Sequence, residues 1–147
     1  MTDKLRTGKV PLIIRNLKPW DSNGKRDLAV VGGRFVEPVP GMQAELTIDA
    51  EGRLAVPGFI EPHINLDKAL IVESVRLNVS GTLTEAIEII WERKRRYSID
   101  EIAERAGRVS KAAIANGITH LRTRVDVDTI GGLRPFAGVA LGAVAGK

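Results

Sequence analysis

Two helix-start signals, set between two apolar runs, constrain the fold of this chain most. Thr82-Leu83-Thr84-Glu85 and Ser98-Ile99-Asp100-Glu101 each place a hydroxyl three residues before a glutamate. In such a capping box, the two side chains bond to backbone amides that would otherwise be free at the start of a helix. Apolar residues then recur at helical spacing, and Asn116-Gly117 offers a residue suited to positive φ at the end. The sequence therefore predicts two consecutive helices.

The runs on either side of these helices are predicted to be strands. In the run Phe59 to Leu66, alternation places Glu61, His63 and Asn65 on one face. The run Ile118 to Val127 has an apolar face of Leu121, Thr123, Val125 and Val127, and a polar face of His120, Arg122, Arg124 and Asp126. A strand–helix–strand crossover of this length implies parallel strands and an α/β fold. The polar face is too charged for an ordinary core, so we expect it to line a cavity.

The pattern of apolar residues and turn signals divides the chain into three segments. Short apolar runs separated by turn signals predict a small β-sandwich or meander over residues 1–56. We expect residues 57–136 to form part of a (β/α)₈ barrel, whose mouth suits polar residues at strand ends, although a full barrel takes about 250 residues. The last segment, residues 137–147, is an atypical tail rich in alanine and glycine, and its glycine spacing predicts a poor helix.

Composition narrows the function classes. The 147 residues include no cysteine, which excludes disulfides and thiolate metal sites. Neither a signal peptide nor an apolar run of membrane length is evident, so we expect a soluble, cytoplasmic protein without a membrane partner. The net charge is +4, and the basic run Arg93-Lys94-Arg95-Arg96 is predicted to be a solvated helix end. Nucleic-acid binding through residues 92–96 is a weaker alternative, because no aromatic residues interleave with the basic ones.

Several motifs in the predicted strands resemble those of one enzyme family. They are Pro57-Gly58-Phe59-Ile60-Glu61-Pro62-His63, Asp67-Lys68, Gly117-Ile118-Thr119 and Arg122-Thr123-x-Val125-Asp126-Val127-Asp128. Together they resemble the metal-dependent amidohydrolase superfamily, and within it the cytosine deaminase-like branch, which includes hydrolases of aminated ring compounds such as triazines. The resemblance covers roughly residues 10–136. It implies the N-terminal portion of a (β/α)₈ barrel preceded by a small β-sandwich segment.

The resemblance also implies a chemistry. Members of the family hydrolyse non-peptide C–N bonds with a divalent metal, commonly zinc or iron, whose bound water is the nucleophile. His63 matches the first metal ligand, whereas Asn65 stands in the second ligand position, and an amide oxygen is a weak donor for such ions. Arg124 stands where this branch usually has histidine. We expect Arg124 and Asp126 in the substrate pocket, paired either in a polar cavity or on an exposed edge.

Two readings of the function follow from these departures. The first is the N-terminal part of a deaminase-like hydrolase, truncated or frameshifted near residue 136, with an aminated ring compound as ancestral substrate. The chain lacks most of the family's catalytic residues, so we expect no turnover. The second is a non-catalytic binding or regulatory module that acts beside a full-length paralogue. An open parallel sheet edge also predicts self-association.

Overall fold

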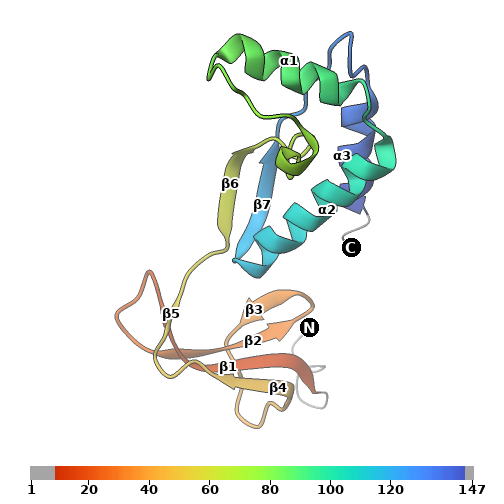
Figure 1. The fold of residues 1–147 in the computed structure, drawn as a ribbon. Coiled ribbons are helices and arrows are strands. Elements are labelled where there is room, and N and C mark those ends of the chain that lie inside the picture. The colour runs from red at the N-terminus through yellow and green to blue at the C-terminus, as the bar shows by residue number, and fades with distance from the viewer. Residues whose placement is uncertain (1–8, 145–147) are drawn as a thin grey trace. The chain divides into compact units, whose positions relative to one another are not determined.

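The computed structural model describes residues 9–144 and divides the chain after Pro57 (Figure 1). The first unit, Met1–Pro57, is built from strands, and the second, Gly58–Lys147, combines strands and helices. The candidate site lies in the second unit. None of the helices within residues 9–144 is both long enough and apolar enough to cross a membrane.

A mixed five-stranded sheet forms the first unit. Its strands are β1 (Val10–Pro19), β2 (Arg26–Val31), β3 (Arg34–Val36), β4 (Ala44–Asp49) and β5 (Leu54–Ala55). The order is β3-β2-β1-β4; β1 pairs antiparallel with β2 and parallel with β4 and β5. Gly32 and Gly33 both have positive φ, as a two-residue β2–β3 hairpin requires. The buried side chains of Val10, Ile13 and Ala29 form the core of this unit.

The second unit has the predicted strand–helix–helix–strand order. It contains β6 (Phe59–Ile64), the short 3₁₀ helix η1 (Val72–Ser74), α1 (Leu83–Lys94), α2 (Ile99–Ala115), β7 (Ile118–Thr123) and α3 (Arg134–Val144). Strands β6 and β7 are parallel, as predicted. The Thr82 and Ser98 side chains accept hydrogen bonds from the amides of Glu85 and Glu101, so both helix starts are confirmed. Gly117 follows α2 with a φ of +81°.

Strand β6 is irregular, which changes the side chains that share a face. Glu61 pairs with Leu121 and Ile64 pairs with Thr123, so three steps along β6 match two along β7. Pro62 lies at this irregularity, where its missing N–H costs least. Paired residues of neighbouring strands share a face, so Glu61 and Ile64 lie on one side although they are three residues apart. Regular alternation is therefore interrupted between them, and the prediction that Glu61, His63 and Asn65 share a face stays a prediction.

Strand β7 is shorter than predicted. It ends at Thr123, because its partner strand β6 ends at Ile64. The last backbone hydrogen bond between them runs from the Arg124 amide to the Ile64 carbonyl oxygen, at 2.8 Å. The segment from Arg124 to Asp128 therefore leaves the sheet as irregular chain. This departure frees it to turn towards α1.

Helix α3 contradicts, for residues 137–144, the prediction that the glycine spacing of the tail makes a poor helix; residues 145–147 lie outside the described residues. Its glycines lie against α2 so closely that a Cβ on Gly138 would stand 2.5 Å from the Cβ of Ile102. A Cβ on Gly142 would stand 2.6 Å from the Ala103 carbonyl oxygen. Small residues four apart let two helix backbones approach, and this contact outweighs the low helix propensity of glycine. The core beside α2 consists of Leu66, Tyr97, Ile102, Ala106 and Val139.

Candidate functional site at the carboxyl ends of β6 and β7

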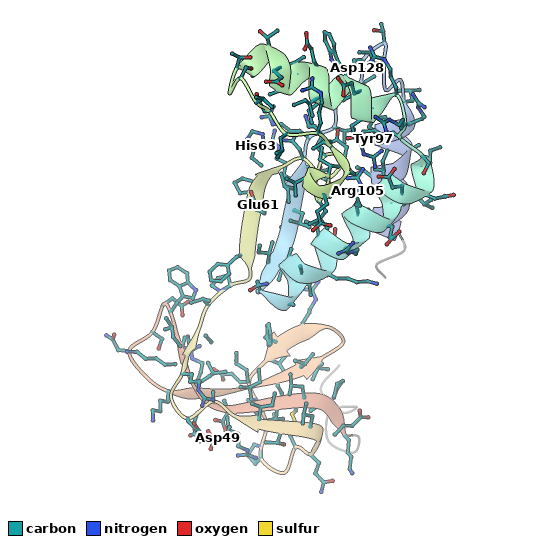
Figure 2. The ribbon with its side chains drawn as sticks, viewed as in Figure 1. Asp49, Glu61, His63, Tyr97, Arg105 and Asp128 are labelled. Atoms are coloured by element: carbon teal, nitrogen blue, oxygen red, sulfur yellow. The ribbon has the colours of Figure 1, made fainter. Side chains whose placement is uncertain are left out.

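Charged side chains meet where the two parallel strands of the second unit end. Asp67 and Lys68 follow β6, Asp126 and Asp128 follow β7, and Lys94 is the last residue of α1. Figure 2 shows Asp128 beside α1, beyond the end of β7. In α/β folds, ligands bind outside the carboxyl ends of the strands. The location alone therefore marks this cluster as the candidate site.

Two lysines and two aspartates form a connected ion-pair network. Lys94 Nζ lies 2.8 Å from Asp126 Oδ2 and 2.5 Å from Asp128 Oδ2, and Lys68 Nζ lies 2.8 Å from the same oxygen of Asp126. The Lys94 residue is only 2% exposed. An ammonium group buried this deeply requires charged partners, because its hydration is lost. The two aspartates supply these partners.

The network holds its members in their charged forms. Burial alone would lower the pKa of Lys94, but hydrogen bonds to Asp126 and Asp128 outweigh it and raise the pKa. Hydrogen bonds from Lys68 and Lys94 lower the pKa of Asp126. The Asp128 pKa falls to about 2, first because of Lys94 and then because of the amide of Gly131. All three groups are consequently ionised at neutral pH.

A buried carboxylate ties the loops after the two strands together. Asp67 is 0% exposed, and its Oδ2 accepts a hydrogen bond from the Asp126 amide at 3.3 Å. Its Oδ1 has no hydrogen-bond partner among residues 9–144. Burial raises the pKa of Asp67, and the Asp126 amide opposes that rise. Asp67 thus fixes the backbone from which the Asp126 side chain extends.

Helix α2 holds the same loop through Arg105, which points to it in Figure 2. The guanidinium donates to the carbonyl oxygen of Asp67 through both terminal nitrogens, at 3.1 Å each, and to that of Ala69 at 2.5 Å. Its Cζ atom lies 5.5 Å from the ring centroid of Tyr97. A planar guanidinium suits this combination of forked donation and ring stacking. Arg105 therefore positions the loop from which Lys68 extends.

The basic run at the end of α1 is only partly the solvated helix end that was predicted. Arg95 and Arg96 are exposed. Arg93 instead pairs with Glu101 and lies over the Tyr97 ring, and Lys94 enters the ion-pair network. A buried lysine in a run of four basic residues carries no local sequence signal, because its burial depends on the aspartates brought by β7.

A pocket of about 340 Å³ lies between α1 and the network. The network supplies its polar wall. Helix α1 supplies an apolar wall that includes Leu83, Ile87 and Trp91. Trp91 is 43% exposed, so part of its ring faces open space. The arrangement gives a small site with one apolar side and one charged side.

The four site residues predicted from sequence lie in different environments. Asp126 lines the pocket. Arg124 is exposed, and the Asp126 carboxylate pairs with Lys68 and Lys94. His63 is exposed, and its amide donates to Glu61 Oε1 at 3.0 Å. Asn65 is half-buried and its carbonyl oxygen accepts from the Lys68 amide at 3.2 Å.

The residues present do not fit the metal that the resemblance implies. Residues 9–144 bring together no group of three or more histidine, cysteine, aspartate or glutamate side chains able to hold an ion. Of the carboxylates near His63, that of Glu61 bonds to the His63 amide and that of Asp67 is buried against Asp126. Zinc in proteins takes three or four nitrogen, sulfur or carboxylate ligands. His63 and Asn65 do not complete such a set.

The chain is similar to amidohydrolases and deaminases of known sequence and structure. It is 28% identical over 125 residues to N-isopropylammelide isopropyl amidohydrolase from Pseudomonas sp. strain ADP, covering 81% of this chain and 31% of that enzyme. Among solved structures, N-isopropylammelide isopropylaminohydrolase from Burkholderia multivorans matches with a TM-score of 0.70 and 27% identity, covering 91% of this chain and 34% of the other. No family model matches the chain.

Two further structures agree. The 5-methylcytosine deaminase from Klebsiella pneumoniae, liganded with phosphonocytosine, gives a TM-score of 0.66 at 31% identity, covering 91% of this chain and 34% of the deaminase. Atrazine chlorohydrolase from Arthrobacter aurescens TC1, complexed with zinc, shares the fold with a TM-score of 0.59 at 21% identity over 92% of this chain and 34% of its own. The chain thus spans about a third of the relatives it matches. The resemblance to amidohydrolases of the cytosine deaminase-like branch, over their N-terminal part, is confirmed.

Proposed function

We propose that this chain carries the N-terminal elements of an amidohydrolase-type hydrolase of non-peptide C–N bonds in aminated ring compounds. In this proposal β6 and β7 are the first two strands of a (β/α)₈ barrel, residues 57–136 form the partial barrel, and residues 1–56 form the sandwich segment before it. The observation that carries the proposal is the convergence of Lys68, Lys94, Asp126 and Asp128 at the carboxyl ends of two parallel strands. The similarity to an N-isopropylammelide amidohydrolase and a 5-methylcytosine deaminase supports it.

We expect that residues 9–144 do not by themselves complete a catalytic centre. A divalent metal would supply the attacking hydroxide in this chemistry. His63 offers one imidazole, and Asn65 offers only an amide where a second imidazole is needed. We therefore expect the chain by itself to release no ammonia from ring substrates. Any remaining ligands and proton-transfer groups would have to come from other residues.

The alternative is a non-catalytic binding or regulatory module, and one observation favours it. The polar wall of the pocket is neutralised internally by ion pairs, and the described residues offer no group of ligands that could hold a metal. A pocket of this kind retains the ability to bind a ring after the chemistry is lost. In that case the partner would be the small ring itself or a full-length paralogue.

Metal content and ammonia release test the proposal together. The purified chain and its Asn65→His variant are dialysed against zinc and then against metal-free buffer, and bound metal is measured by mass spectrometry. The expected result is well below one zinc per chain for the wild type and a higher zinc content for Asn65→His. No ammonia should form from cytosine in either case. One tightly held zinc per wild-type chain, or ammonia release by the wild-type chain, would overturn the expectation that its catalytic centre is incomplete.

A further inference from the structure

The pocket beneath α1 is close to neutral although four charged side chains line it. Lys68 and Lys94 bring two positive charges, and Asp126 and Asp128 bring two negative ones. An anion entering the pocket would meet both carboxylates, and a cation would meet both ammonium groups, each within a few ångströms. Neither gains a net attraction from the described lining. The pocket therefore suits an uncharged ligand.

Two polar atoms in this lining keep free capacity for hydrogen bonding. Lys68 Nζ has three donors and uses one on Asp126 Oδ2. Asp126 Oδ1 accepts no hydrogen bond from any residue in the described part of the chain. The side chains are 25% and 40% exposed, whereas that of Lys94 is 3% exposed and closed off. A donor and an acceptor thus stand side by side on the open part of the polar wall.

The opposite wall is apolar and includes one flat side chain. Trp91 is 43% exposed and Ile87 41% exposed, and both line the pocket from α1. An indole face stacks well on another planar ring, whatever that ring's substituents. The volume of about 340 Å³ lies near the lower end of small-molecule pockets, which run from about 300 to 1,000 Å³. The space fits a single small ring.

We infer that this pocket binds a small, uncharged, planar heteroaromatic ring in which a hydrogen-bond acceptor stands next to a donor. Lys68 donates to the acceptor, Asp126 Oδ1 accepts from the donor, and Trp91 covers the face of the ring. The inference rests on the proposed function for the class of compound. It adds the residues that recognise the ring, and it makes recognition independent of metal because neither His63 nor Asn65 lines the pocket.

Fluorescence of Trp91 tests the inference directly in the full chain. The chain has two tryptophans, and Trp20, which is 64% exposed, belongs to the first unit. Trp20→Phe leaves Trp91 as the sole reporter. Titration with cytosine in the presence of EDTA should give saturable quenching. In the same background, Lys68→Met and Asp126→Asn should each weaken binding about tenfold or more, because each removes a hydrogen bond to a charged group.

Two controls separate ring recognition from general effects. Pyrimidine has the same ring without the exocyclic acceptor and donor, and it should bind about tenfold more weakly than cytosine. Lys111→Met removes an exposed lysine of α2 outside this pocket and should leave cytosine binding unchanged. Equal binding of the two rings, equal effects of Lys68→Met and Lys111→Met, or no saturable quenching up to the solubility limit would each overturn the inference.

A second variant keeps the test decisive if Lys68→Met does not fold, as judged by circular dichroism. Ile87→Lys alters a position on the apolar wall that is 41% exposed, and its side chain would occupy the pocket. It should abolish cytosine binding. Retained binding in this variant would overturn the inference.

The outcomes also distinguish this inference from the proposed function. Cytosine binding in EDTA without ammonia release upholds both. Absence of binding together with absence of ammonia overturns the ring site and leaves the proposed function standing. Ammonia release after zinc loading overturns the expectation that the catalytic centre is incomplete, whatever the binding data show.

Discussion

Arg105 holds Asp67 by its backbone: both terminal guanidinium nitrogens lie 3.1 Å from the Asp67 carbonyl oxygen. The carboxylate of Asp67 is thereby left free to accept from the amide of Asp126. One arginine of α2 thus indirectly fixes both loops at the candidate site. Its contribution is to position them, because it does not line the pocket.

Arg105→Met should lower the free energy of unfolding by about 3 kcal/mol, because the carbonyl oxygens of Asp67 and Ala69 lose their donors in a buried setting. Urea unfolding followed by circular dichroism measures the change. Arg108→Met is the matched control, since Arg108 lies one turn further along α2 and is exposed. It should shift the free energy by less than about 0.5 kcal/mol. Equal effects of the two variants would contradict the role assigned to Arg105.

Gly138→Ala should destabilise the second unit by about 1–3 kcal/mol, because the added methyl group would stand 2.5 Å from the Cβ of Ile102. Gly107→Ala is the control, on the facing helix. Its nearest neighbour would be the Gly142 carbonyl oxygen at 3.9 Å, so the methyl group fits. That variant should stabilise α2 by about 0.5–1 kcal/mol through helix propensity. Thermal unfolding of the two variants should therefore shift in opposite directions.

Stability should fall in acid through Asp128. Its pKa is lowered from 3.8 to about 2 in the folded chain, chiefly by the hydrogen bond from Lys94. A carboxyl with a lowered folded pKa stabilises the fold above its unfolded pKa, and that stabilisation is lost as pH falls through the folded value. The loss should occur between about pH 4 and pH 2. Burial raises the pKa of Asp67, so its titration acts in the opposite sense.

Comparison with Asp128→Asn isolates this contribution to the acid response. Urea midpoints measured from pH 5 down to pH 2 should decline less steeply for the variant than for the wild type, because the variant has lost one of the titrating groups. Glu85, whose pKa is also lowered to about 2, remains in both chains and cancels in the difference. Parallel pH profiles would argue against the ion pair of Lys94 with Asp128.

The chain should self-associate in a concentration-dependent way. Strand β6 pairs with β7 on one side only within residues 9–144, and its residues Phe59 and Ile60 are 60% and 67% exposed. Unpaired, apolar strand edges recruit other chains, and a lysine on such an edge opposes this. Ile60→Lys should therefore reduce association in sedimentation velocity. Val79→Lys should leave association unchanged, because Val79 is 88% exposed in a loop outside the sheet. A monomer at all concentrations would refute the proposal.

The regular parts of the second unit could be predicted because their signals are local. The capping boxes at Thr82 and Ser98 need only residues three positions away, and the parallel pairing follows from the length of the crossover. Asp126 could be proposed as a pocket residue because its strand face was too charged for a core. The burial of Lys94 and the role of Arg105 could not be predicted, because they depend on partners distant in sequence.

Lys94 illustrates the limit. In the sequence it is one of four consecutive basic residues. Its burial is stable only because Asp126 and Asp128, which follow α2 and β7 in the sequence, pair with its ammonium group. Arg105 is likewise one charged residue among several on α2 until the loop at Asp67 packs against it. The face assignment of His63 stays a prediction, because the irregularity between Glu61 and Ile64 interrupts the alternation on which it relied.

The contact of Gly138 and Gly142 with α2 also constrains how the two helices can change in sequence. Gly138 lies against Ile102 and the carbonyl oxygen of Ile99, and Gly142 lies against Ala103 and Ala106. A larger residue at either glycine would require α3 to move away from α2 or a smaller side chain to replace one on α2. The sequences of α2 and α3 therefore depend on each other, although β7 separates them along the chain.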